Sequence, residues 1–208
     1  MSQPYDRGCE VPSPGKPDED LGEFWETSPW RIAGFHNLSA FERNRTFLNV
    51  EGEDFLDISY VTGADSDGDG RASLAVDLNH DGQLELLVRQ AGGGSLVIYG
   101  NRFPKRHWLK VTLRGVESNR LGIGSKLFVK TARHRQMREL FPMNSYMSQT
   151  ASMVHFGLGD ADEIDEVEIL WPSGEKQRLT NVRVDQHIVV EEGDEDFQVI
   201  KPGDYFQP

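Results

Sequence analysis

The sequence predicts an all-β protein, because short apolar runs recur roughly every ten residues and turn residues separate them. In residues 109–113 and 167–171, large apolar side chains occupy every second position, which is the period of a half-buried strand. The 208 residues include 21 glycines and 10 prolines, as a chain with many turns requires. No window shows the apolar stripe of an amphipathic helix, so we expect a β-sandwich or a barrel-like unit.

The expected strands follow one another from residue 46 to residue 192. They lie at 46–50, 55–60, 71–77, 83–90, 95–100, 107–114, 123–131, 134–140, 152–158, 165–171, 175–180 and 187–192. The chain is accordingly divided into an extended arm (1–45), a first β unit (46–101), a second β domain (102–193) and an acidic C-terminal tail (194–208).

The arm at 1–45 holds five of the ten prolines and shows no hydrophobic periodicity, so we expect it to form little secondary structure. It also contains Trp25 and Trp30, and exposed tryptophans are unfavourable in water. Two explanations stay open for these aromatic side chains: they pack on the chain's own β core, or they pack on a partner protein.

The strongest local motif is the segment DLNHDGQLE at residues 77–85. It has the spacing of a calcium loop: oxygen ligands at positions 1, 3 and 5, a glycine at 6, a backbone carbonyl at 7 and a carboxylate at 9. The predicted Ca²⁺ ligands are Asp77, Asn79, Asp81, Gln83 and Glu85. Position 12 is Val88 and the flanks read as strands, so the loop is not an EF-hand. The alternative is a hairpin closed by Asx turns without a metal.

A second acidic cluster at residues 65–70 repeats the same spacing, with Asp65, Asp67 and Asp69 followed by a glycine. Its position 9 is Ser73, so the closing carboxylate is missing. A polar turn is the favoured interpretation, and a weaker second ion site or a contribution to the first site are the alternatives.

Common enzyme motifs are absent: the sequence has no GxSxG, no HExxH, no P-loop and no GxGxxG opening a helix. The six histidines lack metal-ligand spacing, and we expect His107 and His155 to be strand residues satisfied by their own sheet. The lone Cys9 excludes an intramolecular disulfide and a zinc site built from cysteines. We therefore predict that the protein is not an enzyme, although a triad assembled only by the fold stays open.

The net charge of −12 makes binding to a nucleic-acid backbone unfavourable. The charge is unevenly distributed, because residues 101–159 carry 11 basic and 2 acidic side chains between two acidic blocks. Neutralisation within one folded unit is the favoured explanation, and a polarised surface that orients the protein on a charged partner is the alternative.

No apolar run approaches the roughly 18 residues that a membrane-spanning helix needs. The first residues lack a basic segment followed by an apolar one, so no signal peptide is visible. The protein is expected either to remain where it is made or to be exported by a signal that this sequence does not contain.

Two stretches resemble known families. FLNVEGEDFLDIS at 47–59, with DGDGRASLAVDLNHDGQLELLV at 67–88, resembles one FG-GAP/VCBS repeat, the calcium-binding blade of integrin-like β-propellers. HWLKVTLRGVESNRLGIGSKLFV at 107–129 and VHFGLGDADEIDEVEILWPSGEKQRLTNV at 154–182 resemble the ASPIC/UnbV domain of cartilage acidic proteins and their bacterial relatives. The resemblance implies one blade-like FG-GAP unit followed by a β-sandwich-like domain, with calcium bound by the loop at 77–85.

One blade departs from the family's usual set of repeats, and a single blade leaves faces and edges without neighbours. The arm, the second domain or another protein must cover them. The resemblance therefore implies a non-catalytic, calcium-stabilised accessory or scaffold subunit that docks on other proteins. We expect it on the periplasmic or extracellular side, peripherally associated through its partners with a membrane assembly such as a bacterial photosynthetic complex.

Two other functions stay open. A calcium-dependent carbohydrate- or matrix-binding module would stack its tryptophans on sugar rings, but Trp108 and Trp171 lie in strand patterns that favour the core. An enzyme or maturation factor of a biosynthetic cluster is suggested only by relatives of the UnbV type.

Overall fold

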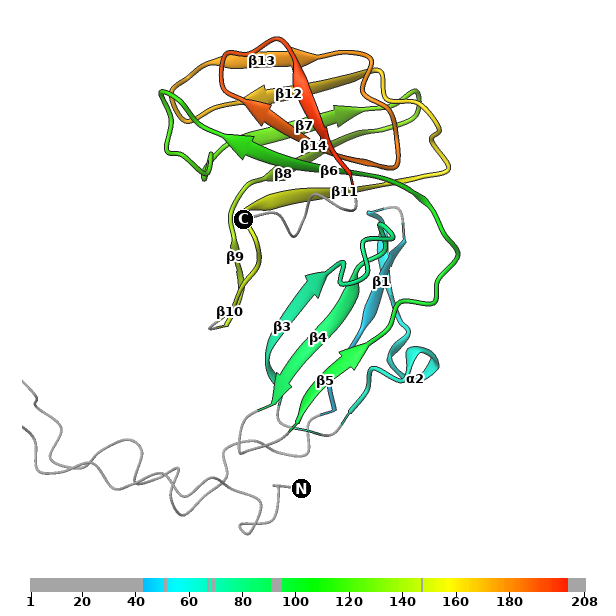
Figure 1. Cartoon of the computed structure of the whole chain (residues 1–208). Helices are drawn as coiled ribbons and strands as arrows, with labels where there is room; N and C mark the ends of the chain where they lie inside the picture. The colour runs from blue at the N-terminus through cyan, green and yellow to red at the C-terminus, as the bar shows by residue number, and fades with distance from the viewer. Residues whose placement is uncertain are drawn as a thin grey trace, which may run out of the picture. The chain divides into compact units, whose positions relative to one another are not determined.

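The computed structural model describes residues 43–50, 52–66, 68, 70–90, 95–146 and 148–201, and it is all-β apart from one short helix (Figure 1). The chain divides into two compact units. The first consists of Met1–Ser73 and Leu87–Tyr99, and the second of Leu74–Leu86 and Gly100–Pro208. The predictions for Trp25 and Trp30 fall outside the described residues. Within these residues, no helix is long and apolar enough to cross a membrane.

The N-terminal strands are short and form an antiparallel pair and a three-stranded sheet. β1 (Phe47–Val50) pairs with β2 (Asp54–Asp57), and a three-stranded sheet has the order β3 (Gly70–Val76), β4 (Glu85–Gln90) and β5 (Leu96–Tyr99). The strand predicted at 55–60 is wrong at its end, because Ser59–Thr62 form the helix α2. Asp57 ends the strand: its Oδ1 accepts the backbone N–H of Ser59 at 2.9 Å, which turns the chain into the helix.

The second unit contains two four-stranded sheets. One has the order β11 (Met153–Gly159), β6 (His107–Arg114), β14 (Gln186–Glu191) and β15 (Phe197–Ile200). The other has the order β13 (Lys176–Leu179), β12 (Glu166–Leu170), β7 (Lys126–Lys130) and β8 (Arg135–Glu139). The pairings are antiparallel except for the parallel pair β6–β14.

One hydrophobic core lies between these two sheets. Leu109, Val111 and Leu113 of β6 belong to the same buried cluster as Val167 and Ile169 of β12. The sandwich predicted for this part of the chain is therefore confirmed. Because side chains alternate along a strand, residues 108, 110 and 112 lie on the opposite, outer face of the sheet that contains β6.

Two further features differ from the predicted strands. The hairpin β9 (Met143–Ser145) and β10 (Ser148–Gln149) was not predicted, because its strands are too short to show a period. The predicted acidic tail at 194–208 contains β15, which pairs antiparallel with β14. Asp194, Glu195 and Asp196 directly precede this strand. Next to these acidic residues, four residues are too few to show a strand period in the sequence.

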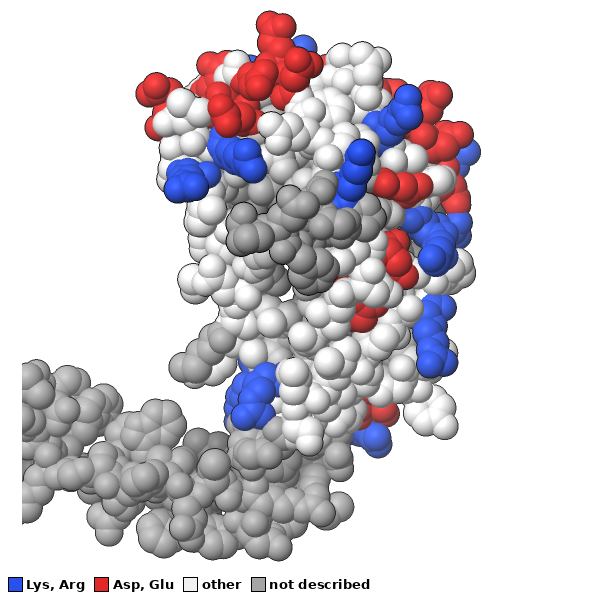
Figure 2. All heavy atoms as spheres, in the orientation of Figure 1, with Lys and Arg blue, Asp and Glu red and all other residues white. Residues whose placement is uncertain are grey.

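Several basic side chains of residues 101–159 lie beside acidic side chains of the neighbouring blocks, which is what the favoured explanation predicts. Strand β7 lies beside the acidic strand β12, where Lys130 is the partner of Glu166 in the ladder. Arg135 pairs with Glu168 at 3.1 Å, and Arg106 pairs with Asp160. Figure 2 shows basic and acidic side chains interspersed over the drawn face, with acidic ones also gathered at the top of the view.

A buried carboxylate holds the loop that follows β6. Glu192 Oε2 accepts the backbone N–H groups of Val116, Glu117 and Ser118 at 2.8, 2.9 and 2.7 Å. Its Oε1 accepts the hydroxyls of Ser118 and Ser173. Although burial raises the pKa of Glu192, the hydrogen bonds from Ser173, Ser118 and Val116 outweigh it and lower the pKa to about 2. The ionised carboxylate is therefore the form that the fold stabilises.

We expect Glu192→Gln to lower the free energy of unfolding at neutral pH by roughly 1–3 kcal/mol, because an amide cannot accept this set of donors. A carboxylate with a lowered folded-state pKa stabilises fully above its ordinary value of about 4.5 and loses this contribution as pH falls toward 2. Denaturant unfolding at several pH values should therefore show the difference between wild type and variant shrinking through this window. Exposed Glu195→Gln is the control, and a difference independent of pH would contradict the assignment.

Candidate functional site

The loop at 77–85 joins β3 to β4 and belongs to the second unit. Asp77 follows β3 directly, and its carboxylate accepts two backbone N–H groups, from Asp81 to Oδ1 at 3.1 Å and from Gly82 to Oδ2 at 2.7 Å. Gly82 has a φ of +87°, which a residue without a Cβ adopts easily. The sequence therefore folds locally into the tight hairpin that its Asp and Gly residues predict.

The other predicted ligands also make hydrogen bonds inside the loop. Asn79 Oδ1 accepts the N–H of Asp81 at 3.1 Å, and Asp81 Oδ1 accepts the N–H of Gln83 at 2.9 Å. Glu85 Oε2 turns back to accept the N–H of Leu78 at 2.9 Å. The five residues lie in one loop, but their oxygens serve the backbone of that loop.

The outer face of the sandwich supplies a cation for the loop. Lys110, in the middle of β6, forms an ion pair through its Nζ with Asp77 Oδ2. Both side chains are buried, with 4% and 2% of their surfaces exposed. Burial raises the pKa of Asp77, but the hydrogen bonds from Lys110 and Gly82 outweigh it, so the pKa is lowered overall and the carboxylate is ionised. The Lys110 ammonium also lies 5.0 Å from the ring centroid of Trp108.

Three further contacts hold the turn of the loop in place within the second unit. Trp108 lies so close to Gly82 that a Cβ at this glycine would overlap the indole ring. His155, on the neighbouring strand β11, donates through Nε2 to the Gly82 carbonyl at 2.9 Å, and its ring stacks on that of Trp108 at an interplanar angle of 9°. Gln83 donates through Nε2 to the carbonyl of Phe103 at 2.8 Å.

Lys110 lies between two histidines in one cross-strand row. His155 of β11 and His187 of β14 are its partners on either side. Burial lowers the pKa of His155 despite its hydrogen bond to Gly82, and burial together with the charge of Lys110 lowers the pKa of His187 to about 4. His187 also bonds through Nε2 to the Thr112 hydroxyl at 2.8 Å. At neutral pH both imidazoles are therefore uncharged, and Lys110 carries the positive charge of the row.

The arrangement does not fit a calcium cage. Calcium requires several oxygens turned toward one point. In the part of the chain that the structure describes, no group of three or more His, Cys, Asp or Glu residues is placed to hold a metal ion. The first carboxylate is paired with a buried ammonium, which would repel a divalent cation strongly where water is excluded. Bound calcium therefore stays a prediction from the sequence.

The second acidic cluster is described only in part, because Asp67 and Asp69 fall outside the described residues. Asp65 forms an ion pair with Arg43 at 3.2 Å. Ser66 Oγ accepts a hydrogen bond from the backbone N–H of Gly68 at 3.1 Å. The described contacts are those of the polar turn that the sequence favoured.

A hollow of about 400 Å³ lies beside the loop in the second unit. His107 Nδ1 is 2.7 Å from Asp185 Oδ2 at its wall, so His107 bonds to a loop carboxylate rather than within its sheet. Lys105 lies 4.0 Å from Asp81, and Arg106 pairs with Asp160. The residues that line the hollow, all within the described ranges, include no Ser, Thr or Cys, so no hydroxyl or thiol nucleophile among them accompanies the His107–Asp185 pair.

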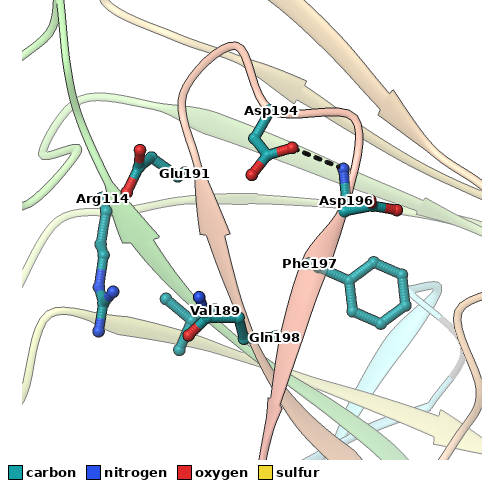
Figure 3. A pocket seen from close by; sticks show the side chains of 7 residues that line it. All are labelled: Arg114, Val189, Glu191, Asp194, Asp196, Phe197 and Gln198. Carbon is teal, nitrogen blue, oxygen red and sulfur yellow. Dashed lines mark hydrogen bonds between the residues drawn. The ribbon is translucent and has the colours of Figure 1, made fainter.

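A smaller hollow of about 160 Å³ lies at the other end of β14. Figure 3 shows Arg114 on one side of it and Phe197 on the other, with Asp194 accepting the backbone N–H of Asp196 at 3.1 Å. Its lining combines one guanidinium with several carboxylates, and this mixture favours no particular class of ligand.

Trp108, Lys110 and His155 were missed as site residues by sequence reasoning. All three occupy the non-core positions of their strands, and such positions read as solvent-facing or as satisfied within the sheet. The prediction that Trp108 is a core residue is wrong, because it lies on the outer face, whereas the same prediction for Trp171 is confirmed. Nothing in the local sequence signals that another segment covers this face.

Residues 115–196 match the protein family described as ASPIC and UnbV. The match covers most of the sandwich, and it confirms this half of the resemblance seen in the sequence. The match does not include the stretch that resembles an FG-GAP/VCBS repeat, so that half stays a prediction. No curated protein sequence is significantly similar to the chain.

We expect Gly82→Ala to lower the melting temperature more than Gly193→Ala. Both glycines have a left-handed φ, of +87° and +82°, so alanine is strained to a similar degree at each. Only at Gly82 would the new methyl group overlap Trp108, whereas Gly193 has open space. The extra overlap should lower the melting temperature by roughly a further 5 °C. Equal losses in the two variants would show that the loop does not rest on Trp108.

Proposed function

We propose that the protein is a non-catalytic interaction module that docks on a partner protein through apolar side chains of its first unit. The observation that carries the proposal is the exposure of both strands of the β1–β2 hairpin. Phe55 and Leu56 are 64% and 57% exposed, and Phe47 and Leu48 are 53% and 44% exposed. A two-stranded hairpin with large apolar groups in water on both faces gains stability when another surface covers it.

Other elements of the first unit also expose large apolar side chains. Tyr60 and Val61 in α2 are 89% and 85% exposed, and Leu96 and Ile98 in β5 are 55% and 53% exposed. Isolated apolar residues on a surface need no explanation, but this number in so small a unit is typical of an interaction surface. The second unit also exposes some large apolar side chains, among them Phe103, Phe141 and Met143. It has a large buried core, however, to which the described buried apolar residues of the first unit do not belong.

The setting of the interaction rests on the family resemblance. ASPIC/UnbV domains follow FG-GAP repeats in extracellular-type proteins, and this supports a partner on the periplasmic or extracellular side. A membrane-associated assembly, with a bacterial photosynthetic complex as one candidate, is the more specific form of the proposal. The proposed docking does not require bound calcium, because Lys110 forms an ion pair with Asp77, the first predicted ligand of the loop.

The described residues give no support to a sugar-binding function. Trp171 is in the core and donates through Nε1 to Gln177 at 2.9 Å. The half-buried ring of Trp108 contacts Lys110 and Gly82 and lies 6.3 Å from the ring of His155, centroid to centroid, so these neighbours occupy part of its surface. Neither ring is fully exposed in the way that a platform for a sugar requires.

A photo-crosslinking amino acid tests the proposal in the organism from which the chain comes. Placed at Tyr60 of the full chain, it should give one dominant protein adduct, identified by mass spectrometry, because this side chain is nearly fully exposed among apolar neighbours. Introducing Leu56→Ser and Val61→Ser into the same chain should reduce the adduct several-fold, since docking would lose apolar area.

The matched control carries the crosslinker at Glu175, an exposed position in the second unit. This position should not give the same adduct. Equal adducts from both positions, or an adduct at Tyr60 that the two serine substitutions do not reduce, would contradict docking through the first unit.

A further inference from the structure

We propose that the ammonium of Lys110 is the resident cation of the loop at 77–85, and that the loop is closed without a metal ion. The loop has the sequence spacing of a calcium site, yet its first carboxylate is neutralised by a side chain from β6. The fixed lysine then performs the electrostatic role that a divalent ion has in loops of this spacing.

The first argument is the burial of the pair. A lysine is almost never fully buried unless an opposite charge accompanies it, and Lys110 has 4% of its side chain exposed. The described groups beside it in its row are the uncharged imidazoles of His155 and His187. Asp77 is the anion that makes this burial possible, so the lysine and the loop depend on each other.

The second argument is the use of the carboxylate oxygens. Asp77 Oδ2 accepts both the Lys110 ammonium and the Gly82 N–H, while Oδ1 accepts the N–H of Asp81. Glu85, the predicted closing ligand, is directed to the N–H of Leu78. The loop is thus satisfied by donors of the chain itself, which leaves no converging set of oxygens for an ion.

The third argument is the rigidity of the lysine. Lys110 lies on a central strand, between β11 and β14, and its ammonium is held beside the ring of Trp108. A side chain on an exposed loop could move aside for an ion at little cost. This one would have to leave a buried position and disrupt the contacts that also hold Gly82.

The test compares calcium binding and thermal stability in the full chain. Wild type should show the same melting temperature, within about 1 °C, in millimolar calcium and in excess chelator, because a ligand raises it only by binding the folded state. Calorimetric titration with calcium should show no saturable heat. A saturable heat, or a melting temperature raised by calcium, would overturn the proposal.

Substitutions test the lysine directly. Lys110→Met should lower the melting temperature by roughly 10 °C, because it leaves a buried carboxylate without its partner. Asp77→Asn combined with Lys110→Met should recover part of this loss, since neither charge then remains. Lys105→Met is the matched control, because Lys105 is 77% exposed and only 4.0 Å from Asp81.

The proposal is contradicted if the double variant loses as much melting temperature as the Asp77→Asn and Lys110→Met variants lose together. It is also contradicted if Lys105→Met lowers the melting temperature as much as Lys110→Met does. If Lys110→Met does not fold, the double variant and the calcium titration of wild type still decide the question.

Discussion

The buried charge pair of Asp77 and Lys110 determines where the loop at 77–85 lies. Neither charge could be removed from water alone, because an unpaired buried ion costs several kcal/mol. Once the two meet, the turn residue Gly82 lies against Trp108, and its carbonyl accepts the hydrogen bond of His155. The outer face of the sheet is therefore covered by a polar loop, and a lysine occupies the position of a buried residue.

Such a pair contributes specificity more than stability. The cost of desolvating both ions offsets most of their attraction, so two apolar residues of similar size could be as stable in the same place. What the pair excludes is a shifted loop, because any other position would leave one ion buried and unpaired. The uncharged state of His155 and His187 at neutral pH sharpens this preference, since no other cation in the row competes for the carboxylate.

The sequence revealed the elements whose signals are local. Alternation predicted β6 and β12, the Asp and Gly residues predicted the hairpin turn, and the second acidic cluster reads as a turn in its described part. Features that depend on distant contacts were not accessible. Lys110 lies 33 residues from Asp77, and β15 becomes recognisable as a strand only because β14 is beside it. The calcium interpretation rested on spacing alone, and spacing does not show which donors the fold brings to the oxygens.

The sandwich of the second unit has one buried hydrophobic core, whereas the first unit has apolar side chains exposed on its strands. The central claim is that a tethered ammonium, and not a metal, neutralises the loop. NMR detection of the Lys110 ¹⁵Nζ ammonium signal in calcium-free protein tests it most directly, with Lys110→Met used for assignment. The account predicts a signal whose protons exchange slowly with water and whose position millimolar calcium leaves unchanged. A rapidly exchanging ammonium, or one that calcium displaces, would contradict it.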